Sequence, residues 1–346
     1  NGDCLPVTDE VTINFTPAPT ASAGSDQTVC ANNPEVNLNG SVTIASGGTW
    51  SGGAGSFVPD ANVLNPVYTP SAAEIAAGSV TLTLTTSGNG TCNPVSDEIT
   101  ITITPAPEVE AGIGEELCAN NAEIALNGSV TVATGGTWSG GSGTFTPDAN
   151  TLNATYTPSA GEISAGSVNL ILTSTGNGNC VPVSDNVTYT FSPAPTADAG
   201  VDQTVCSNNA DVILNGSVTV ASGGTWSGGT GTFSPDANTL NATYTPSAAD
   251  IAAGSVILTL TTTGNGDCFS ESDNMTITFT PSPTANAGSD VTVCANNPNV
   301  NLNGQVTVAT GGTWSGGAGT FTPDAATLSA VYTPSPAEIA AGSVTL

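Results

Sequence analysis

One block of sequence recurs in this chain every 88 residues, and this repeat limits the possible folds more than any other feature. The stretch GGTWSGG begins at Gly47, Gly135, Gly223 and Gly311. A period near 90 residues is too long for a solenoid unit of about 20–50 residues and fits a small domain that folds by itself. We therefore predict a row of similar domains.

The domain boundaries follow from linkers of the form P-x-P, which open at Pro17, Pro105, Pro193 and Pro281. The predicted parts are the C-terminal strand of a preceding repeat at 1–16, complete repeats at 17–104, 105–192 and 193–280, and a truncated fourth repeat at 281–346. Because the sequence begins and stops inside the repeat pattern, we expect it to be a segment of a longer array.

Within one repeat nearly every signal favours β-structure. Apolar and threonine residues alternate in SVTLTLTTSGNG at 79–90 and in EITITIT at 98–104, which indicates two half-buried strands joined as a hairpin. Further short strands are predicted at 35–44, 47–50, 55–58 and 66–69. About seven strands in one repeat predict an all-β fold, a tandem array of immunoglobulin-like β-sandwiches.

One short helical turn per repeat interrupts the strands. A serine precedes each turn and an acidic residue follows three positions later, which is the spacing of a capping box. The predicted caps are Ser71 with Glu74, Ser159 with Glu162, Ser247 with Asp250, and Ser335 with Glu338.

The absence of basic residues excludes many functions. The chain has 28 acidic residues, a formal charge of −28, and no lysine, arginine or histidine. Nucleic-acid binding needs cations that neutralise phosphates, and nucleophilic triads and histidine zinc sites need histidine. No window reaches the roughly 18 consecutive apolar residues of a membrane span. We predict a protein that is not an enzyme, needs no cofactor, and has no nucleic-acid partner and no membrane span.

The cysteines fall into two series, each spaced by one repeat. Cys30 and Cys92 lie 62 residues apart in the first complete repeat. We predict disulfides inside each repeat, because the final strand carries the chain about 30 Å away from Cys92, too far for a bridge to the next repeat. The predicted pairs are Cys30–Cys92, Cys118–Cys180 and Cys206–Cys268, which leaves Cys4 and Cys294 without partners. Persistent disulfides indicate an extracellular location.

The four tryptophans all lie inside the glycine frame. An exposed indole could stack on sugar rings, whereas a buried indole would fill the space between two sheets. Because the chain is poor in aromatic residues, we predict that all four indoles lie in the core. These residues are Trp50, Trp138, Trp226 and Trp314.

Acidic residues gather near the boundary between the first two complete repeats. Carboxylates are the ligands that Ca²⁺ prefers, although no EF-hand loop is present. Calcium bridging between repeats is therefore an open alternative to a merely repelling acidic surface. The candidate ligands are Asp97, Glu108, Glu110, Glu115 and Glu116.

Three stretches, AGSDQTVCANNPEVNLNGSV, GGTWSGGAGSF and YTPSAAEIAAGSVTLTLTTSGNGTC, resemble the PKD-like or immunoglobulin-like repeats of giant surface proteins of Bacteroidota. That family includes gliding-associated adhesins exported by type IX secretion. The resemblance covers essentially the whole chain. It implies extracellular display, attachment to the cell surface, and a role as a stalk or an adhesive surface filament.

Two functions are compatible with these sequence features. The first is a semi-rigid stalk that extends a binding tip towards a cell-surface ligand, since proline-rich linkers favour extended geometry. Copies of the chain could associate side by side through threonine-rich faces, on which Ile171 and Ile257 are apolar exceptions. The alternative is a multivalent module in which each repeat binds a glycan or a protein.

Overall fold

The computed structural model describes residues 2, 3 and 5–346 of the chain. It is an all-β structure with one short helix in each repeat, and this confirms the predicted fold class. The chain divides into two compact units, which meet between Ser192 and Pro193. The first unit contains repeats 1 and 2, and the second contains repeat 3 and the truncated repeat 4.

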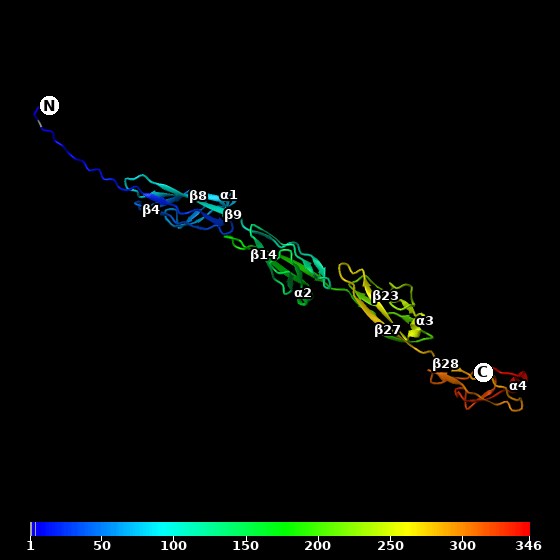
Figure 1. Ribbon diagram of the computed structural model, residues 1–346. Helices are drawn as coiled ribbons and strands as arrows, with labels where there is room; N and C mark the ends of the chain where they lie inside the picture. Colours follow the sequence, from blue (N-terminus) through cyan, green and yellow to red (C-terminus); the bar gives the residue numbers. More distant parts are fainter. Residues whose placement is uncertain (1, 4) are drawn as a thin grey trace. The chain divides into compact units, whose positions relative to one another are not determined.

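Figure 1 shows the elements in chain order, from the blue N-terminal end to the red C-terminal end. Repeat 1 contains β1 (Thr20–Ser22), β2 (Gln27–Cys30), β3 (Val36–Asn37), β4 (Ser41–Thr43), β5 (Gly47–Ser51), β6 (Ser56–Val58), β7 (Val67–Thr69), α1 (Ala72–Ala77), β8 (Ser79–Ser87) and β9 (Ser96–Thr104). Repeat 2 contains β10 (Glu108–Glu110), β11 (Glu116–Cys118), β12 (Ile124–Ala125), β13 (Ser129–Thr131), β14 (Gly135–Ser139), β15 (Thr144–Thr146), β16 (Thr155–Thr157), α2 (Ala160–Ala165), β17 (Ser167–Thr175) and β18 (Ser184–Ser192).

The second unit follows the same order. Repeat 3 contains β19 (Thr196–Asp198), β20 (Gln203–Cys206), β21 (Val212–Ile213), β22 (Ser217–Thr219), β23 (Gly223–Ser227), β24 (Thr232–Ser234), β25 (Thr243–Thr245), α3 (Ala248–Ala253), β26 (Ser255–Thr263) and β27 (Ser272–Thr280). Repeat 4 contains β28 (Thr284–Asn286), β29 (Val300–Asn301), β30 (Gln305–Thr307), β31 (Thr320–Thr322), β32 (Val331–Thr333) and α4 (Pro336–Ala341).

Each complete repeat is a sandwich of two main sheets. In repeat 1 the four-stranded sheet has the order β2-β9-β8-β5, and the three-stranded sheet has the order β3-β7-β6. A separate two-stranded sheet pairs β1 with β4. The inward faces of the hairpin β8–β9 carry Leu82, Leu84, Ile99 and Ile101, which are buried in the core as their alternation predicts.

The predicted strand at 35–44 is in fact two strands in different sheets. The break falls at Gly40, whose amide donates to the carbonyl O of Leu64 at 3.1 Å. A Cβ on Gly40 would lie 2.9 Å from Cζ2 of Trp50, so the backbone passes directly against the indole. Only glycine fits there, and the chain crosses from one sheet to the other at that point.

The first predicted segment also differs from expectation. Residues 5–16 form no strand and are exposed along their length. A strand requires a hydrogen-bonded neighbour, and none of the described strands pairs with this segment. Its alternating sequence is therefore compatible with a strand but does not suffice to form one.

Candidate functional site: the junction between repeats

The short strand β2, which the alternation pattern did not predict, fixes the position of Cys30. β2 pairs with β9 in parallel, and the register places Cys30 opposite Thr104, the last residue of repeat 1. The next amide, of Ala31, donates to the carbonyl O of Thr104 at 2.8 Å. Cys30 therefore lies at the linker end of repeat 1, with its side chain fully buried.

The turn between β17 and β18 brings Cys180 to the same place from repeat 2. Cys180 forms a disulfide with Cys30 across a sequence separation of 150 residues, and their Cα atoms are 4.9 Å apart. The two sulfurs lie on the linker itself: Sγ of Cys30 is 3.7 Å and Sγ of Cys180 is 3.6 Å from the carbonyl O of Pro105. Repeats 1 and 2 are thus joined covalently beside their linker.

Two asparagines hydrogen-bond across this disulfide junction. The side-chain amide of Asn32 makes two hydrogen bonds to the backbone of Val181. Its Nδ2 donates to the carbonyl O at 3.0 Å, and its Oδ1 accepts from the amide at 3.2 Å. From the opposite side, Nδ2 of Asn179 donates to the carbonyl O of Thr28 at 2.8 Å. We call the Cys30–Cys180 bridge and these three hydrogen bonds the junction.

The predicted disulfides inside repeats are therefore wrong. Cys180 is bonded to Cys30, so neither Cys30–Cys92 nor Cys118–Cys180 forms. Cys206 is a free cysteine, so Cys206–Cys268 does not form either. The reason is the parallel pairing of β2: it carries the first cysteine of a repeat to the linker end, a full strand of about 30 Å from the hairpin turn.

The remaining cysteines occupy half-junctions of the same kind. Sγ of the free Cys92 lies 3.8 Å from the carbonyl O of Pro17, as Cys180 lies against Pro105. Sγ of the free Cys206 lies 3.9 Å from the carbonyl O of Pro281, as Cys30 lies against Pro105.

Among the other cysteines, Cys118 and Cys268 are also disulfide-bonded. Cys294, for which no partner was predicted, is free and exposed. Cys4, which was expected to lack a partner too, lies outside the described residues.

The tryptophans of the three complete repeats lie in the core. Trp50, Trp138 and Trp226 are each 2 % exposed, and Nε1 of each donates to a backbone carbonyl 14 residues later, that of Leu64 in repeat 1, at 3.0–3.1 Å. These indoles are not available to stack on a sugar. Trp314 is half-buried and keeps its hydrogen bond to the carbonyl O of Leu328, at 3.2 Å.

The glycine frame surrounds the indole for a steric reason. A Cβ on Gly48 would lie 2.8 Å from Cδ1 of Leu84, inside the core. Gly52 and Gly53 follow β5 with φ of 82° and 71°, a conformation that L-residues rarely adopt. The repeated GGTWSGG motif is therefore a packing and turn motif around a core tryptophan.

All four helices have the predicted caps. Each serine accepts from the backbone of the third helical residue, and the acidic side chain there returns the bond: Ser71 with Glu74, Ser159 with Glu162, Ser247 with Asp250, and Ser335 with Glu338.

Sequence reasoning missed a second role of these carboxylates. Oε1 of Glu74 also accepts from the hydroxyl of Tyr68 at 2.9 Å and from the amide of Ala54 at 2.7 Å. Burial raises the pKa of Tyr68 to about 12, and the neighbouring carboxylate adds to the rise. Burial pushes the pKa of Glu74 upward, but hydrogen bonds from Ser71 and Ala54 outweigh it and hold the pKa below its usual value. The carboxylate thus ties the helix to the turn after β5.

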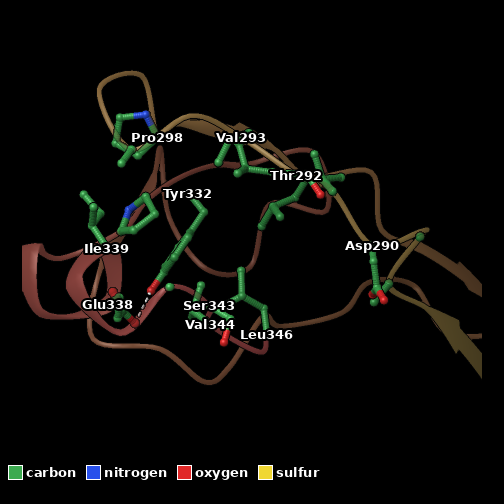
Figure 2. Close-up of a pocket in the computed structure, with 18 of the residues that line it drawn as sticks. Asp290, Thr292, Val293, Pro298, Tyr332, Glu338, Ile339, Ser343, Val344 and Leu346 are labelled. Atoms are coloured by element: carbon green, nitrogen blue, oxygen red, sulfur yellow. Dashed lines mark hydrogen bonds between the residues drawn. The ribbon is translucent and has the colours of Figure 1, made fainter.

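One cavity lies in repeat 4 and has a volume of about 460 Å³. Figure 2 shows Tyr332, Ile339, Val344 and Leu346 around it, and a dashed line from Tyr332 to Glu338 marks a 2.9 Å hydrogen bond. The counterparts of Tyr332 and Leu346 in repeat 1 are Tyr68 on β7 and Leu82 on β8, both buried in the core. The cavity therefore lies among positions that belong to the core in repeat 1.

The candidate calcium ligands do not converge. Within residues 2, 3 and 5–346, no three acidic or cysteine side chains are grouped so that they could hold a metal ion. Oδ2 of Asp97 instead accepts from the amide of Ala23 at 2.8 Å, inside repeat 1. No helix of the described chain is long and apolar enough to cross a membrane.

No protein-family model and no curated protein matches this sequence. Among solved structures, the extracellular cadherin domains 3–6 of protocadherin gamma B2 align with 91 % of this chain and 91 % of their own, at 13 % identity and a TM-score of 0.30. A three-domain fragment of mouse cadherin-23 gives 12 % identity, coverage of 77 % and 99 %, and a TM-score of 0.32. A fragment of titin with three immunoglobulin domains is 12 % identical, aligns with 77 % of this chain and 100 % of its own, and gives a TM-score of 0.38.

Proposed function

We propose that this chain is a structural repeat segment of an extracellular adhesin or filament, which extends a binding tip away from the cell surface. The observation that carries the proposal is the Cys30–Cys180 disulfide between repeats. A module built to bind ligand in each repeat has no need of such a bond. A spacer needs it, because the bond restricts bending at the linker.

The chemistry of the repeats supports the same function. The tryptophans of the complete repeats are used for packing, the helix carboxylates for capping, and Cys30 and Cys180 for joining repeats 1 and 2. Disulfides persist in oxidising compartments, which supports an extracellular location. The Bacteroidota surface proteins with type IX export that the sequence resembles fit this setting.

Small-angle scattering of the whole oxidised chain tests the stalk function. Each sandwich should be about 40 Å long, from strands of nine residues plus turns. Four repeats in a row then predict a radius of gyration of about 45 Å, whereas a compact globule of 346 residues would give about 20 Å. A value near the lower figure, or tight binding of a glycan by every repeat, would contradict the stalk.

Lateral assembly of several chains is the second part of the proposal. Each complete repeat and repeat 4 exposes one β-branched residue with a left-handed backbone, at a cost of about 1–3 kcal/mol for such a conformation. These residues, between 55 % and 64 % exposed with φ of 64–68°, are Ile44, Val132, Val220 and Val308. Apolar Ile257 is 59 % exposed on the outer face of β26. Asparagine tolerates this backbone and is polar, so it is the matched replacement.

Light scattering at high protein concentration tests this assembly. The wild-type chain should form oligomers, and a variant with asparagine at all four positions should remain monomeric and equally folded. A wild-type chain that stays monomeric would contradict lateral assembly and would leave the stalk function intact.

A further inference from the structure

The Cys30–Cys180 disulfide closes a loop of about 150 residues, and this loop contains almost all of two sandwiches. Its two ends lie together at the junction, where Asn32 and Asn179 hold the backbones on either side. The chain outside the loop is short on both sides. From Pro17 it runs through β1 and β2 to Cys30, and from Cys180 it runs through β18 to Ser192.

The disulfide therefore changes which bonds carry a pulling force. A force applied before repeat 1 and after repeat 2 reaches Cys30 from one side and Cys180 from the other. The shortest covalent path crosses the bridge and does not pass through residues 31–179. We infer that the junction carries tension past both sandwiches, so that they stay folded under load. This inference rests on the proposed stalk function, in which the chain is pulled between a surface and a ligand.

The two segments that carry the force, residues 17–30 and 180–192, can lengthen only a little when they are pulled straight. Together they contain about 27 residues, which span at most about 95 Å when fully extended. Two folded sandwiches of about 40 Å each already cover most of that distance. β2 and β18 are extended strands in the folded state, so the path is nearly taut before any hydrogen bond breaks.

The loaded strands are also well anchored at the sides. β2 pairs along β9 with Gln27 opposite Ile101, and Oδ1 of Asp26 accepts from the amide of Thr100 at 2.8 Å. β18 pairs with β17 on one side and with β11 on the other. Pulling along these strands loads their hydrogen bonds in parallel and not one after another. We expect the loaded strands themselves to resist force.

Single-molecule force spectroscopy on the full chain tests the inference. The chain has no lysine, so Pro193→Lys, in an exposed linker position, gives a single amine for one handle. The N-terminal amine takes the other. In the oxidised chain we expect no unfolding step of domain size between the handles. In Cys30→Ser/Cys180→Ser, each sandwich of 88 residues should unfold with a gain of about 260 Å.

Cys92→Ser is the matched control, because it removes a free cysteine from the equivalent turn of repeat 1. It should behave like the oxidised parent. Steps of about 260 Å between the handles of the oxidised parent would overturn the inference, whether or not the serine variants fold. That result would leave an extended chain in scattering unaffected, so failure of the inference and failure of the stalk function are distinguishable.

Discussion

Two turns with nearly the same sequence, one in repeat 1 and one in repeat 2, differ in whether their cysteine forms a disulfide. The turn between β8 and β9 carries Cys92, and the turn between β17 and β18 carries Cys180. Both sulfurs lie 3.6–3.8 Å from the carbonyl O of a linker proline, Pro17 or Pro105. Cys180 is bonded to Cys30 and Cys92 is free. Among the described residues, the linker end of repeat 1 lies beside the Cys180 turn, and no such end lies beside the Cys92 turn.

The comparison teaches that the turn is only half of a site. Its partner half is the end of β2 with the following Asn32, which is complete only in a folded sandwich. The cysteine and its contact with a linker proline recur in both turns, so these two features alone do not decide whether a bridge forms. A neighbouring repeat decides it.

The largest expected difference between the two turns is in thermodynamic stability. Cys30→Ser removes the bridge, and closure of a loop of 150 residues stabilises the folded state by about 5 kcal/mol in the chain-entropy model. We expect the first unfolding transition in denaturant to shift by that amount, whereas Cys92→Ser should leave it unchanged. Equal shifts in the two variants would remove the distinction between the turns.

The next difference is in chemical reactivity. A maleimide added to the folded, oxidised chain should modify Cys92, which is half-exposed and free. It should not modify Cys30 or Cys180, which have no thiol. Peptide mass analysis after labelling reads the modified positions directly. Labelling of Cys180 at the level of Cys92 would mean that the bridge is absent.

A smaller difference is expected for the residue just before each cysteine. Asn179→Ala removes the hydrogen bond to the carbonyl O of Thr28, which should cost about 0.5–1.5 kcal/mol and make the bridge easier to reduce. The matched substitution in repeat 1, Thr91→Ala, should change neither quantity. Denaturant unfolding and the rate of reduction by a dithiol measure the two effects. An equal effect of both substitutions would show that Asn179 does not act through the junction.

No difference between repeats 1 and 2 is expected in acid. Hydrogen bonds hold the pKa of Glu74 and of Glu162 below the usual value, despite opposing burial. The unfolded value is about 4.3, so the stability that these carboxylates provide is present above that pH and is lost as pH falls through the lower folded value. NMR of the Ser71 and Ser159 amides from about pH 6 to about pH 2 should show the same loss in both. Earlier loss in one repeat would mean that the junction also affects the caps.

Local features of this chain could be predicted from the sequence because each depends on neighbouring residues. Alternation located β8 and β9, and the Ser71–Glu74 spacing located the helix cap. The shortage of aromatic residues indicated a core position for Trp50, which is 2 % exposed. These signals act over a few residues and recur in every repeat.

The junction could not be predicted in the same way. β2 is only four residues long, and its parallel partner β9 lies about 75 positions later, so no periodic pattern marks the pairing. Without β2 the end of the sandwich at which Cys30 lies is unknown, so the length of the last strand, about 30 Å, excluded a bridge from Cys92 to the next repeat but did not place Cys30. The second contacts of Glu74, with Tyr68 and Ala54, were missed for the same reason: they join segments that only the sandwich brings together.

Disulfide mapping tests the central claim, that the bridge joins one repeat to the next. Trypsin has no site in this chain, but a protease that cuts after acidic residues releases Cys30 in Gln27–Glu35, Cys180 in Ile163–Asp185 and Cys92 in Ile75–Asp97. Without reduction, mass spectrometry should find Gln27–Glu35 linked to Ile163–Asp185. A link from Gln27–Glu35 to Ile75–Asp97 would place the bridge inside one repeat and contradict the account.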